Sequence, residues 1–319
     1  MRQMTKVQKE RFRIVRQKTN KHQIPYTRFF FACWLILFLF SGDVWADKNV
    51  AKPSSIRDLS SVYINHPDSN FKFGATIELG FLSVLSHNIQ FGKGGTNFDY
   101  VRDGGQDNLF LYSRLSIDLK LFHRHNITFL YQPLTLNTSV ALRNEVRQDE
   151  TTFKKGQPMD LRYGFDFYRI SYTYDVLSSR RNELSFGASL QLRNANIIFS
   201  SVDGQQRVFR NDVGPVPVLR ARGRFMPGNS GFWFGFEVDG FYAPVSYLNG
   251  SDSDVVGAIL DASLRVGKEL TPFMDVFLNL RYVGGGGSGT TTKEREPGSD
   301  GFTSNWVHLF SLSIGVSLK

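Results

Sequence analysis

The sequence has almost no cysteine, since Cys33 is the single one in 319 residues. One thiol cannot form a disulfide within the chain, so the fold must be held by its architecture instead. A long apolar run is lacking as well. The run Phe29 to Phe40 has twelve residues, which is short for a membrane-spanning helix of roughly 20.

Helical periodicity and the common cofactor motifs are also missing. No stretch of the chain beyond residue 70 repeats apolar residues with the spacing of a helix face. Phosphate-binding loops, dinucleotide fingerprints and zinc-ligand spacings are absent. The sequence therefore predicts neither a helical domain nor a bound cofactor or metal.

Residues 1–46 have the layout of a secretory signal peptide. A basic segment precedes the run Phe29 to Phe40, and a short polar stretch then ends in the small residue Ala46. Cleavage is expected between Ala46 and Asp47. The segment carries nine Lys or Arg and two acidic residues, so the mature chain of 273 residues has a net charge of +2 in place of +9. The excess of basic residues belongs to the leader, so the net charge of the mature chain gives no reason to expect a nucleic-acid partner.

The mature chain divides into an irregular arm and a long series of predicted strands. Residues 47–70 mix Lys, Ser, Asp and Asn with two prolines, which favours irregular structure. From Phe71 onwards, apolar and polar residues alternate with the period of a β-strand. Ten strands are predicted, and eight or twelve remain open: 71–84, 108–122, 126–140, 161–177, 183–199, 206–225, 231–245, 254–270, 273–284 and 305–319.

The alternation slips in two of these segments. One slip lies near Pro133, and the other lies between Phe167 and Tyr168. A β-bulge inserts one extra residue into a strand and changes which face its side chains occupy. A bulge is therefore predicted at both places.

The connections alternate between tight turns and longer loops. The short ones lie near 123–126, 178–182, 226–231 and 270–273, and the long ones at 85–107, 141–160, 200–206, 246–253 and 285–304. The loop residues 91–106 and 284–301 are rich in Gly, Asp, Thr and Ser, which predicts flexibility.

The last strand, Trp306 to Lys319, alternates without a break between apolar residues and small polar ones. It resembles the closing strand of bacterial outer-membrane β-barrels, although it ends in Leu318-Lys319 where that family usually has an aromatic residue. The resemblance implies a single all-β, transmembrane, antiparallel up-and-down barrel of about ten strands over residues 71–319. It also implies the outer membrane of a Gram-negative bacterium as the location, with outer-membrane lipid and the barrel-assembly machinery as partners.

The ends of such a barrel follow from the lengths of the connections. Outer-membrane barrels have short turns in the periplasm and longer loops outside. Both termini then fall on the periplasmic side, where Lys319 is expected to overhang. The inward face of the last strand, from Ser311 to Ser317, carries no charge, so the arm or any remaining pore is expected beside it.

The polar face of the predicted strands carries charges of both signs. In a membrane barrel these charges line the lumen, whereas a soluble periplasmic ligand-binding barrel would expose them. Ten inward rows of Leu and Phe would overfill so narrow a barrel, which favours the lumen. The candidate lumenal residues are Glu78, Arg114, Asp118, Arg193, Arg220, Arg222, Arg224, Glu237, Asp239, Asp261, Arg265 and Arg281.

Two groups of these charges lie on neighbouring predicted strands. Arg220, Arg222 and Arg224 form one ladder, while Glu237 and Asp239 form the other. Antiparallel neighbours place such side chains opposite each other, so the ladders are expected to pair. The preferred interpretation is a lumen held closed by ion pairs, and the alternative is an ion-conducting wall.

The preferred function is that of a non-enzymatic outer-membrane protein, either structural or a narrow pore, with a charged and largely filled lumen. The enzymatic alternative is an outer-membrane hydrolase, omptin-like or lipid-modifying. Of the histidines beyond the leader, only His87 is predicted near the outer mouth, as a solvated loop residue, and its neighbour Ser86 would point away from it. The segment 249–254 offers two carboxylates, but it is better explained as a hairpin turn than as a calcium loop.

Overall fold

The computed structural model describes residues 70–177, 179, 181–244, 255–290 and 299–319. The predicted signal peptide, its cleavage site at Ala46 and Asp47, the arm before Asn70 and the segment 249–254 lie outside these residues. None of the described residues belongs to a helix long and apolar enough to cross a membrane. The strands of the described part are β1 (Phe71–Phe91), β2 (Phe98–Asp99), β3 (Leu109–Leu121), β4 (His125–Gln132), β5 (Thr135–Ala141), β6 (Val146–Gln148), β7 (Thr151–Phe153), β8 (Pro158–Asp175), β9 (Glu183–Ser201), β10 (Arg207–Phe225), β11 (Phe232–Pro244), β12 (Val256–Thr271), β13 (Met274–Thr290) and β14 (Phe302–Leu318).

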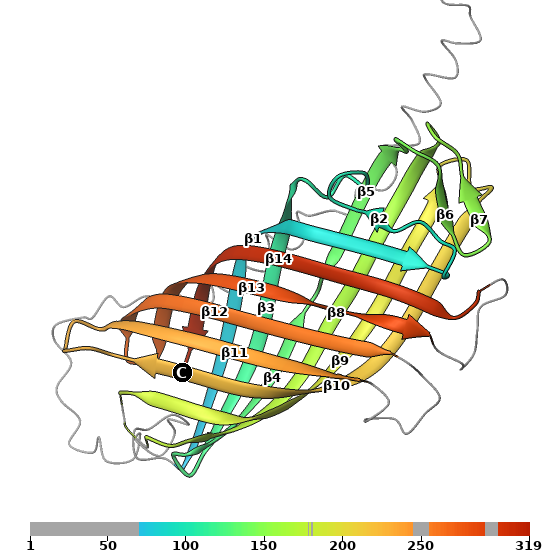
Figure 1. Cartoon of the computed structure of the whole chain (residues 1–319). Helices are drawn as coiled ribbons and strands as arrows, with labels where there is room; N and C mark the ends of the chain where they lie inside the picture. Colours follow the sequence, from blue (N-terminus) through green and yellow to red (C-terminus); the bar gives the residue numbers. More distant parts are fainter. Residues whose placement is uncertain (1–69, 178, 180, 245–254, 291–298) are drawn as a thin grey trace, which may run out of the picture. The chain divides into compact units, whose positions relative to one another are not determined.

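The strands close into an antiparallel barrel (Figure 1). Each long strand pairs with the next one along the chain, and β14 returns to pair with β1. β4 and β5 count as one strand of the barrel wall, here called a stave, because both pair with β8. β2 is a short addition to β1, and β6 pairs only with β7. The described barrel therefore has ten staves, and the predicted fold class is confirmed. Closure leaves no free edge at the seam between the first and last strands.

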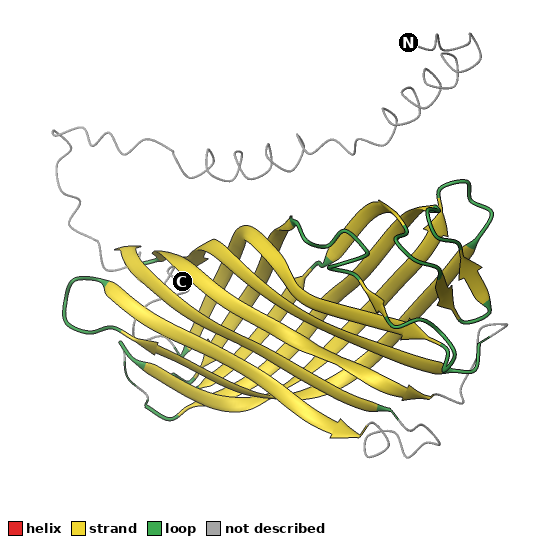
Figure 2. Cartoon of the chain, turned by 45° about the horizontal axis from the view of Figure 1, so that its top comes forward, coloured by secondary structure: helices red, strands yellow, loops and turns green. Residues whose placement is uncertain are grey.

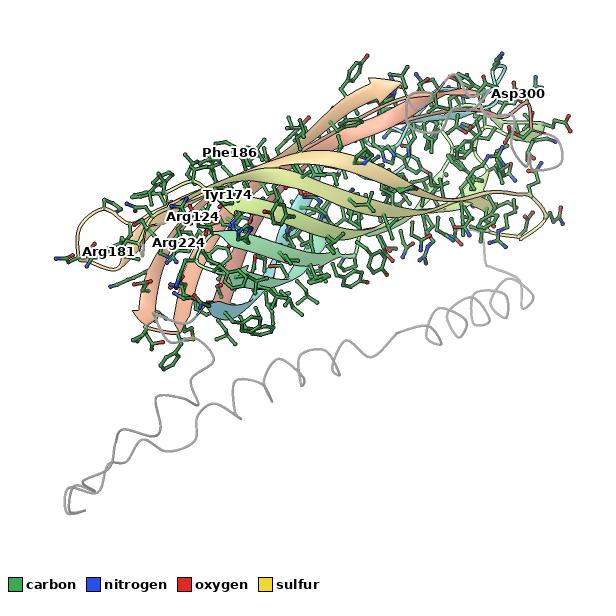
Figure 3. The ribbon with its side chains drawn as sticks, turned by 90° about the horizontal axis from the view of Figure 1, so that it is seen from below. Arg124, Tyr174, Arg181, Phe186, Arg224 and Asp300 are labelled. Atoms are coloured by element: carbon green, nitrogen blue, oxygen red, sulfur yellow. The ribbon has the colours of Figure 1, made fainter. Side chains whose placement is uncertain are left out.

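The two ends of the barrel differ in their connections (Figure 2). Tight turns join β3 to β4, β8 to β9, β10 to β11 and β12 to β13, at the end where β1 starts and β14 stops. Figure 3 shows Arg124, Arg181 and Arg224 at this turn end and Asp300 at the opposite, loop end. Two loop predictions are wrong, because β1 continues through residue 85 to Phe91 and β13 continues through its glycines to Thr290.

The outer surface of the barrel is apolar over a broad belt. Leucine, phenylalanine, isoleucine and tyrosine side chains point outward on nearly every stave, and Leu111 is 74% exposed while Leu264 is 65% exposed. A soluble barrel would have to leave this surface in water, whereas lipid covers it without cost. The belt therefore identifies the outside as the lipid-facing side, and the charged residues face inward.

Neither predicted bulge is present. β8 pairs with β9 in one continuous register through Phe167 and Tyr168, and Gln132 and Thr135 keep the same register with β8 on either side of Pro133. The apparent slips have a different cause. From this height towards the loop end, the inward-facing residues become apolar, so alternation between apolar and polar residues no longer reports the face.

Register shifts lie elsewhere, in β1 between Val84 and Ser86 and at the end of β12 between Glu269 and Thr271. Leu85 points outward and is 57% exposed. The extra residue changes the parity of the strand, so His87, Ile89 and Phe91 all turn into the barrel and are buried. His87 is therefore not a solvated loop residue.

The loop half of the barrel is filled by an apolar plug. Its residues come from the strand ends and from the connections 92–108 and 142–157. Phe98 and Tyr100 of the first connection are buried against Phe199 of β9, with ring centroids 5.4 and 5.6 Å away. Burial raises the pKa of Tyr100 well above its ordinary value, so its phenol stays neutral. The connection that was expected to be flexible is thus packed into the barrel mouth.

Candidate functional site: the charged interior

Nine charged side chains meet in the middle of the lumen, below the plug. They point inward from seven strands and meet at one height, and all but Arg265 are less than 9% exposed. Because ions removed from water must be compensated, a layer of this kind is stable only if its charges are paired. The layer consists of Arg114, Arg169, Arg220, Arg265, Arg281, Glu78, Glu237, Asp239 and Asp261.

Asp261 is the centre of this layer. Its carboxylate accepts hydrogen bonds from Arg114 at 3.2 Å, from Arg169 at 3.1 Å and from Arg281. These guanidinium groups come from β3, β8 and β13, so three separate parts of the wall are tied to one residue of β12. The contacts therefore cross the lumen at this height.

Glu237 and Asp239 of β11 form the second node. Glu237 pairs with Arg265 at 2.9 Å, with Arg281 at 3.1 Å and with Arg220 at 3.2 Å. Asp239 pairs with Arg220 at 2.8 Å and with Arg169 at 2.7 Å. Since Arg169 and Arg281 also bind Asp261, the two nodes form one network.

A second, partly exposed layer lies towards the turn end. Arg222 pairs with Asp118 at 2.9 Å and with Glu183 at 2.8 Å. Below it, Arg224 lies 2.9 Å from Asp275 and 3.3 Å from Glu269. The lumen therefore contains successive charged layers below the plug.

The two ladders pair only in part. Arg220 contacts Asp239, as expected from their register, but Arg222 and Arg224 bind acids of other strands. Glu237 lies opposite Arg222 in the register, yet its oxygens are occupied by Arg220, Arg265 and Arg281. Arg222 therefore pairs with Glu183 of the neighbouring strand β9 and with Asp118 of β3, in place of the β11 partner that the sequence suggested.

The end of the chain contributes to the lowest layer. Lys319 pairs through Nζ with Glu269 at 2.5 Å and with Asp275 at 2.9 Å. The expected overhang of Lys319 into the periplasm is wrong. Lys319, Glu269 and Glu183 were missed as lumenal residues, although the parity of each strand, counted to its last residue, would have included Glu183 and Lys319.

The seam between β1 and β14 is filled rather than open. Ser311 and Ser313 are buried, and Ser313 lies 3.2 Å from Glu78. Thr76 and Ser317 share a hydrogen bond of 2.9 Å across the seam. The ring of Phe277 on β13 occupies the space beside Gly315, which argues against a pore at this seam.

Arg193 differs from the other lumenal arginines. Among the described residues it has no carboxylate partner, and its guanidinium lies over the ring of Phe165, 5.7 Å from the centroid. The Arg193 Nε atom is buried without a hydrogen-bond partner. It is therefore the one predicted site residue that the described network leaves without an acid.

The described histidines form no catalytic constellation with an acid or a serine. His87 is fully buried in the plug, where its ring nitrogens lie 2.7 Å from Gln106 Oε1 and 3.3 Å from Asn305 Oδ1. His308 contacts Tyr282 at 2.6 Å, and His125 contacts Tyr172 at 2.8 Å. No group of three potential metal ligands occurs within the described ranges.

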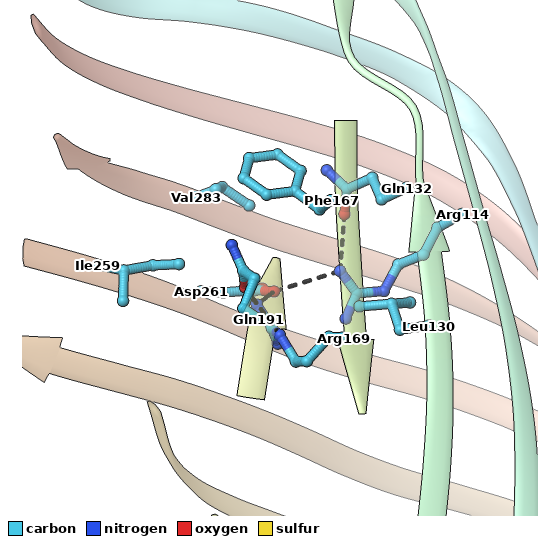
Figure 4. A pocket seen from close by; sticks show the side chains of 9 residues that line it. All are labelled: Arg114, Leu130, Gln132, Phe167, Arg169, Gln191, Ile259, Asp261 and Val283. Atoms are coloured by element: carbon cyan, nitrogen blue, oxygen red, sulfur yellow. Dashed lines mark hydrogen bonds and ion pairs between the residues drawn. The ribbon is translucent and has the colours of Figure 1, made fainter. Parts of the chain in front are cut away.

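A small cavity separates the charged layer from the plug (Figure 4). The cavity has a volume of about 10 Å³, which is room for one water molecule. Arg114, Arg169 and Asp261 lie on its polar side, and Phe167 and Ile259 on its apolar side. The void is far too small to form part of an open channel.

The closed antiparallel wall, apolar outside and charged inside, is the architecture of bacterial outer-membrane β-barrels, in which all backbone groups are paired between strands. On that architecture the predicted class and the outer-membrane location are confirmed. No protein-family model matches the chain, and no curated protein matches it.

Several solved structures of outer-membrane barrels are similar to the chain. The outer membrane protease OmpT from Escherichia coli has 13% identity and a TM-score of 0.38, covering 79% of this chain and 99% of that one. Ail, the attachment invasion locus protein of Yersinia pestis, has 9% identity and a TM-score of 0.33, covering 77% and 99%. The P. putida toluene transporter TodX has 9% identity and a TM-score of 0.34, covering 82% and 91%. These similarities assign no activity to this chain.

Proposed function

We propose that this chain is a non-enzymatic outer-membrane protein whose barrel is closed and serves as a rigid structural element of the envelope. The observation that carries the proposal is the occupied lumen. An ion-paired layer centred on Asp261 and the apolar plug around Phe199 follow one another along the barrel axis. A pore would need a continuous wet path, and two blocks in series are poorly suited to one.

Conductance in planar lipid bilayers tests this proposal. The refolded mature chain should insert without producing stable single-channel steps, because ions would have to cross both the paired charges and a dry plug. A general porin reconstituted in the same way serves as the positive control. A reproducible unitary current from the unaltered protein would contradict the closed barrel and favour the narrow pore.

The hydrolase remains a competing proposal that a separate assay addresses. The burial of His87, with two amides as partners, supports a packing role for this residue instead of a catalytic one. The mature protein in detergent micelles should therefore cleave neither peptides nor phospholipids. Turnover that disappears in His87→Ala but persists in His125→Ala would favour the enzyme.

A further inference from the structure

The turn end of the barrel sorts its charges by sign. Between the central charged layer and the turns, each carboxylate of the described residues points into the lumen and pairs with a lumenal base; these acids are Asp118, Asp175, Glu183, Glu269 and Asp275. Three described bases instead lie outside the lumen at this end: Arg124 and Arg181 in turns (Figure 3) and Lys268 on β12. These three are called the basic rim below. A rim of positive charge attracts a partner of negative charge.

Arg124 lies over the outward face of β8. Its Nη1 atom donates a hydrogen bond of 3.0 Å to the Tyr174 hydroxyl, and its guanidinium carbon lies 5.6 Å from the centre of the Tyr174 ring. The Arg124 carbonyl accepts a hydrogen bond of 2.7 Å from the N–H of Asp175, which fixes the turn against β8. A guanidinium has five N–H donors, and the Tyr174 hydroxyl uses one of them. The group is thus held in place by a neutral partner.

The neighbours of Tyr174 are aromatic as well. His125 Nδ1 lies 2.8 Å from the Tyr172 hydroxyl, and the His125 ring packs edge-on against Tyr174 with the centroids 5.4 Å apart. Phe122 is exposed and stands edge-on to His125 at 6.5 Å. Rings with one polar atom prefer the boundary between hydrocarbon and water. Because Ile170, the next outward residue of β8, is apolar and exposed, the group lies at the lower edge of the apolar belt.

The other two members of the basic rim also contact neutral groups. Lys268 and Phe232 are register partners on β12 and β11, both point outward, and the Lys268 Nζ atom lies 5.1 Å from the centre of the Phe232 ring. Arg181 is exposed and donates a hydrogen bond of 2.6 Å to the side-chain oxygen of Asn229 in the next turn. Two cation–ring pairs on separate parts of the wall therefore mark the same end of the belt.

We propose that the basic rim binds the headgroups of anionic phospholipids in the periplasmic leaflet, with Arg124 as the principal contact. The Arg124 guanidinium binds phosphate oxygens in a forked contact, while the Tyr174 hydroxyl holds it in position. The acyl chains lie along the apolar outward side chains of β4 and β8. Arg181 and Lys268 bind the headgroups of neighbouring lipids.

A lipid fits this surface better than a soluble anion does. Phe129 of β4 and Ile170 of β8 continue from the Arg124 site as exposed apolar surface, which a soluble anion would leave uncovered. An anionic headgroup fits better than a zwitterionic one, because the ammonium group of a zwitterionic headgroup competes with the guanidinium for the phosphate. The charge of the basic rim and the apolar surface beside it therefore select the same partner.

Native mass spectrometry of the mature protein in a non-ionic detergent tests the basic rim. The first phosphatidylglycerol should bind about fivefold more tightly than phosphatidylcholine with the same acyl chains, because it carries a net negative charge. Inorganic phosphate should displace it poorly, because it has no acyl chains. Equal affinity for the two lipids would overturn the proposal. Displacement by inorganic phosphate as effective as by phosphatidylglycerol would reduce the site to one for a small anion and would also overturn it.

Four variants locate the binding. Arg124→Gln should weaken phosphatidylglycerol binding by about fivefold, whereas Arg124→Lys keeps the charge and should weaken it less. Tyr174→Phe removes the hydroxyl that positions the guanidinium but keeps the ring, so it should also cause a smaller loss than Arg124→Gln. Arg102→Gln is the matched control, because it makes the same charge change at the loop end, where Arg102 already pairs with Asp103 at 2.9 Å. It should leave binding unchanged.

Each variant is first checked for the heat-modifiable gel shift of a folded barrel. Since the Arg124 side chain lies outside the charged lumen, Arg124→Gln should fold as the unaltered chain does. A folded Arg124→Gln protein that binds phosphatidylglycerol as tightly as Arg102→Gln does would overturn the proposal. This outcome is independent of the conductance test, because the basic rim lies outside the wall and neither requires nor forbids a closed lumen.

Discussion

In the central charged layer, single carboxylates each pair with several arginines. Asp261 serves three arginines of three different strands, and Glu237 also serves three at 3.2 Å or less. Removing such an acid leaves several buried cations without compensation. Most of the expected loss of stability therefore comes from the buried arginines that are left without a counterion, and less of it from the lost contact itself.

The variant Asp261→Asn should lower the free energy of unfolding by about 3–5 kcal/mol, because it breaks a buried, hydrogen-bonded ion cluster. Unfolding by guanidinium in lipid vesicles, followed by tryptophan fluorescence, measures the change. Asp203→Asn, in the exposed turn between β9 and β10, is the control and should leave the unfolding midpoint nearly unchanged. A midpoint for Asp261→Asn equal to that of the control would argue against a stabilising central layer.

At the scale of the strands, the bulge in β1 decides what the plug contains. Because Leu85 is accommodated as an extra residue, His87, Ile89 and Phe91 point inward. An unbroken alternation from Val84 through Leu85 would place these three side chains on the outward face. The bulge therefore changes which residues of β1 face inward: even-numbered residues do so in its charged half and odd-numbered residues in its apolar half.

Deletion of Leu85 removes the extra residue, so Ser86 follows Val84 in a regular ladder and His87, Ile89 and Phe91 keep their inward positions. We therefore expect the deletion variant to keep the heat-modifiable shift of a folded barrel, with an unfolding midpoint close to that of the control. The substitution Leu85→Ala keeps the bulge and is the matched control, which should fold. Loss of the shift in the deletion variant alone would show that the bulge itself is needed for folding.

The strands themselves could be predicted from the sequence, because lipid outside and polar groups inside impose a strict period of two. The two wrong bulges arose where that rule stops. At Phe167 the lumen becomes apolar, so both faces of β8 carry large side chains and the period fades. The true bulge at Leu85 left no such trace, because apolar residues lie on both sides of it.

The charged candidates could be predicted only as members of a face. Alternation places Arg114 and Asp261 on the inward side, but it contains no information on height. That height depends on the stagger of strands around the barrel. Contacts such as Arg114 with Asp261, 147 residues apart, follow from the closed geometry and have no counterpart in local sequence.

For the molecule as a whole, the partly exposed layer at Arg222, the central charged layer and the plug follow one another along the barrel axis. Arg222→Gln breaks ion pairs with Asp118 and Glu183, and it should lower the free energy of unfolding by about 2 kcal/mol. It should nevertheless produce no leak, since in the proposed closed barrel the central layer and the plug stay in place. Bilayer recordings of Arg222→Gln and the unaltered protein compare the two, and a stable current from the variant would show that the layers above do not seal.

The seam between β1 and β14 has a consequence for biogenesis. Thr76 and Ser317, hydrogen-bonded across it, are 241 residues apart, so the bonding edge of β1 has no lasting partner until β14 has arrived. Pairings over such long distances in sequence form slowly and expose an aggregation-prone edge in the meantime. Lys319 anchors the end of β14 to Glu269 and Asp275, so its ion pairs help to hold the closing strand once the seam has formed.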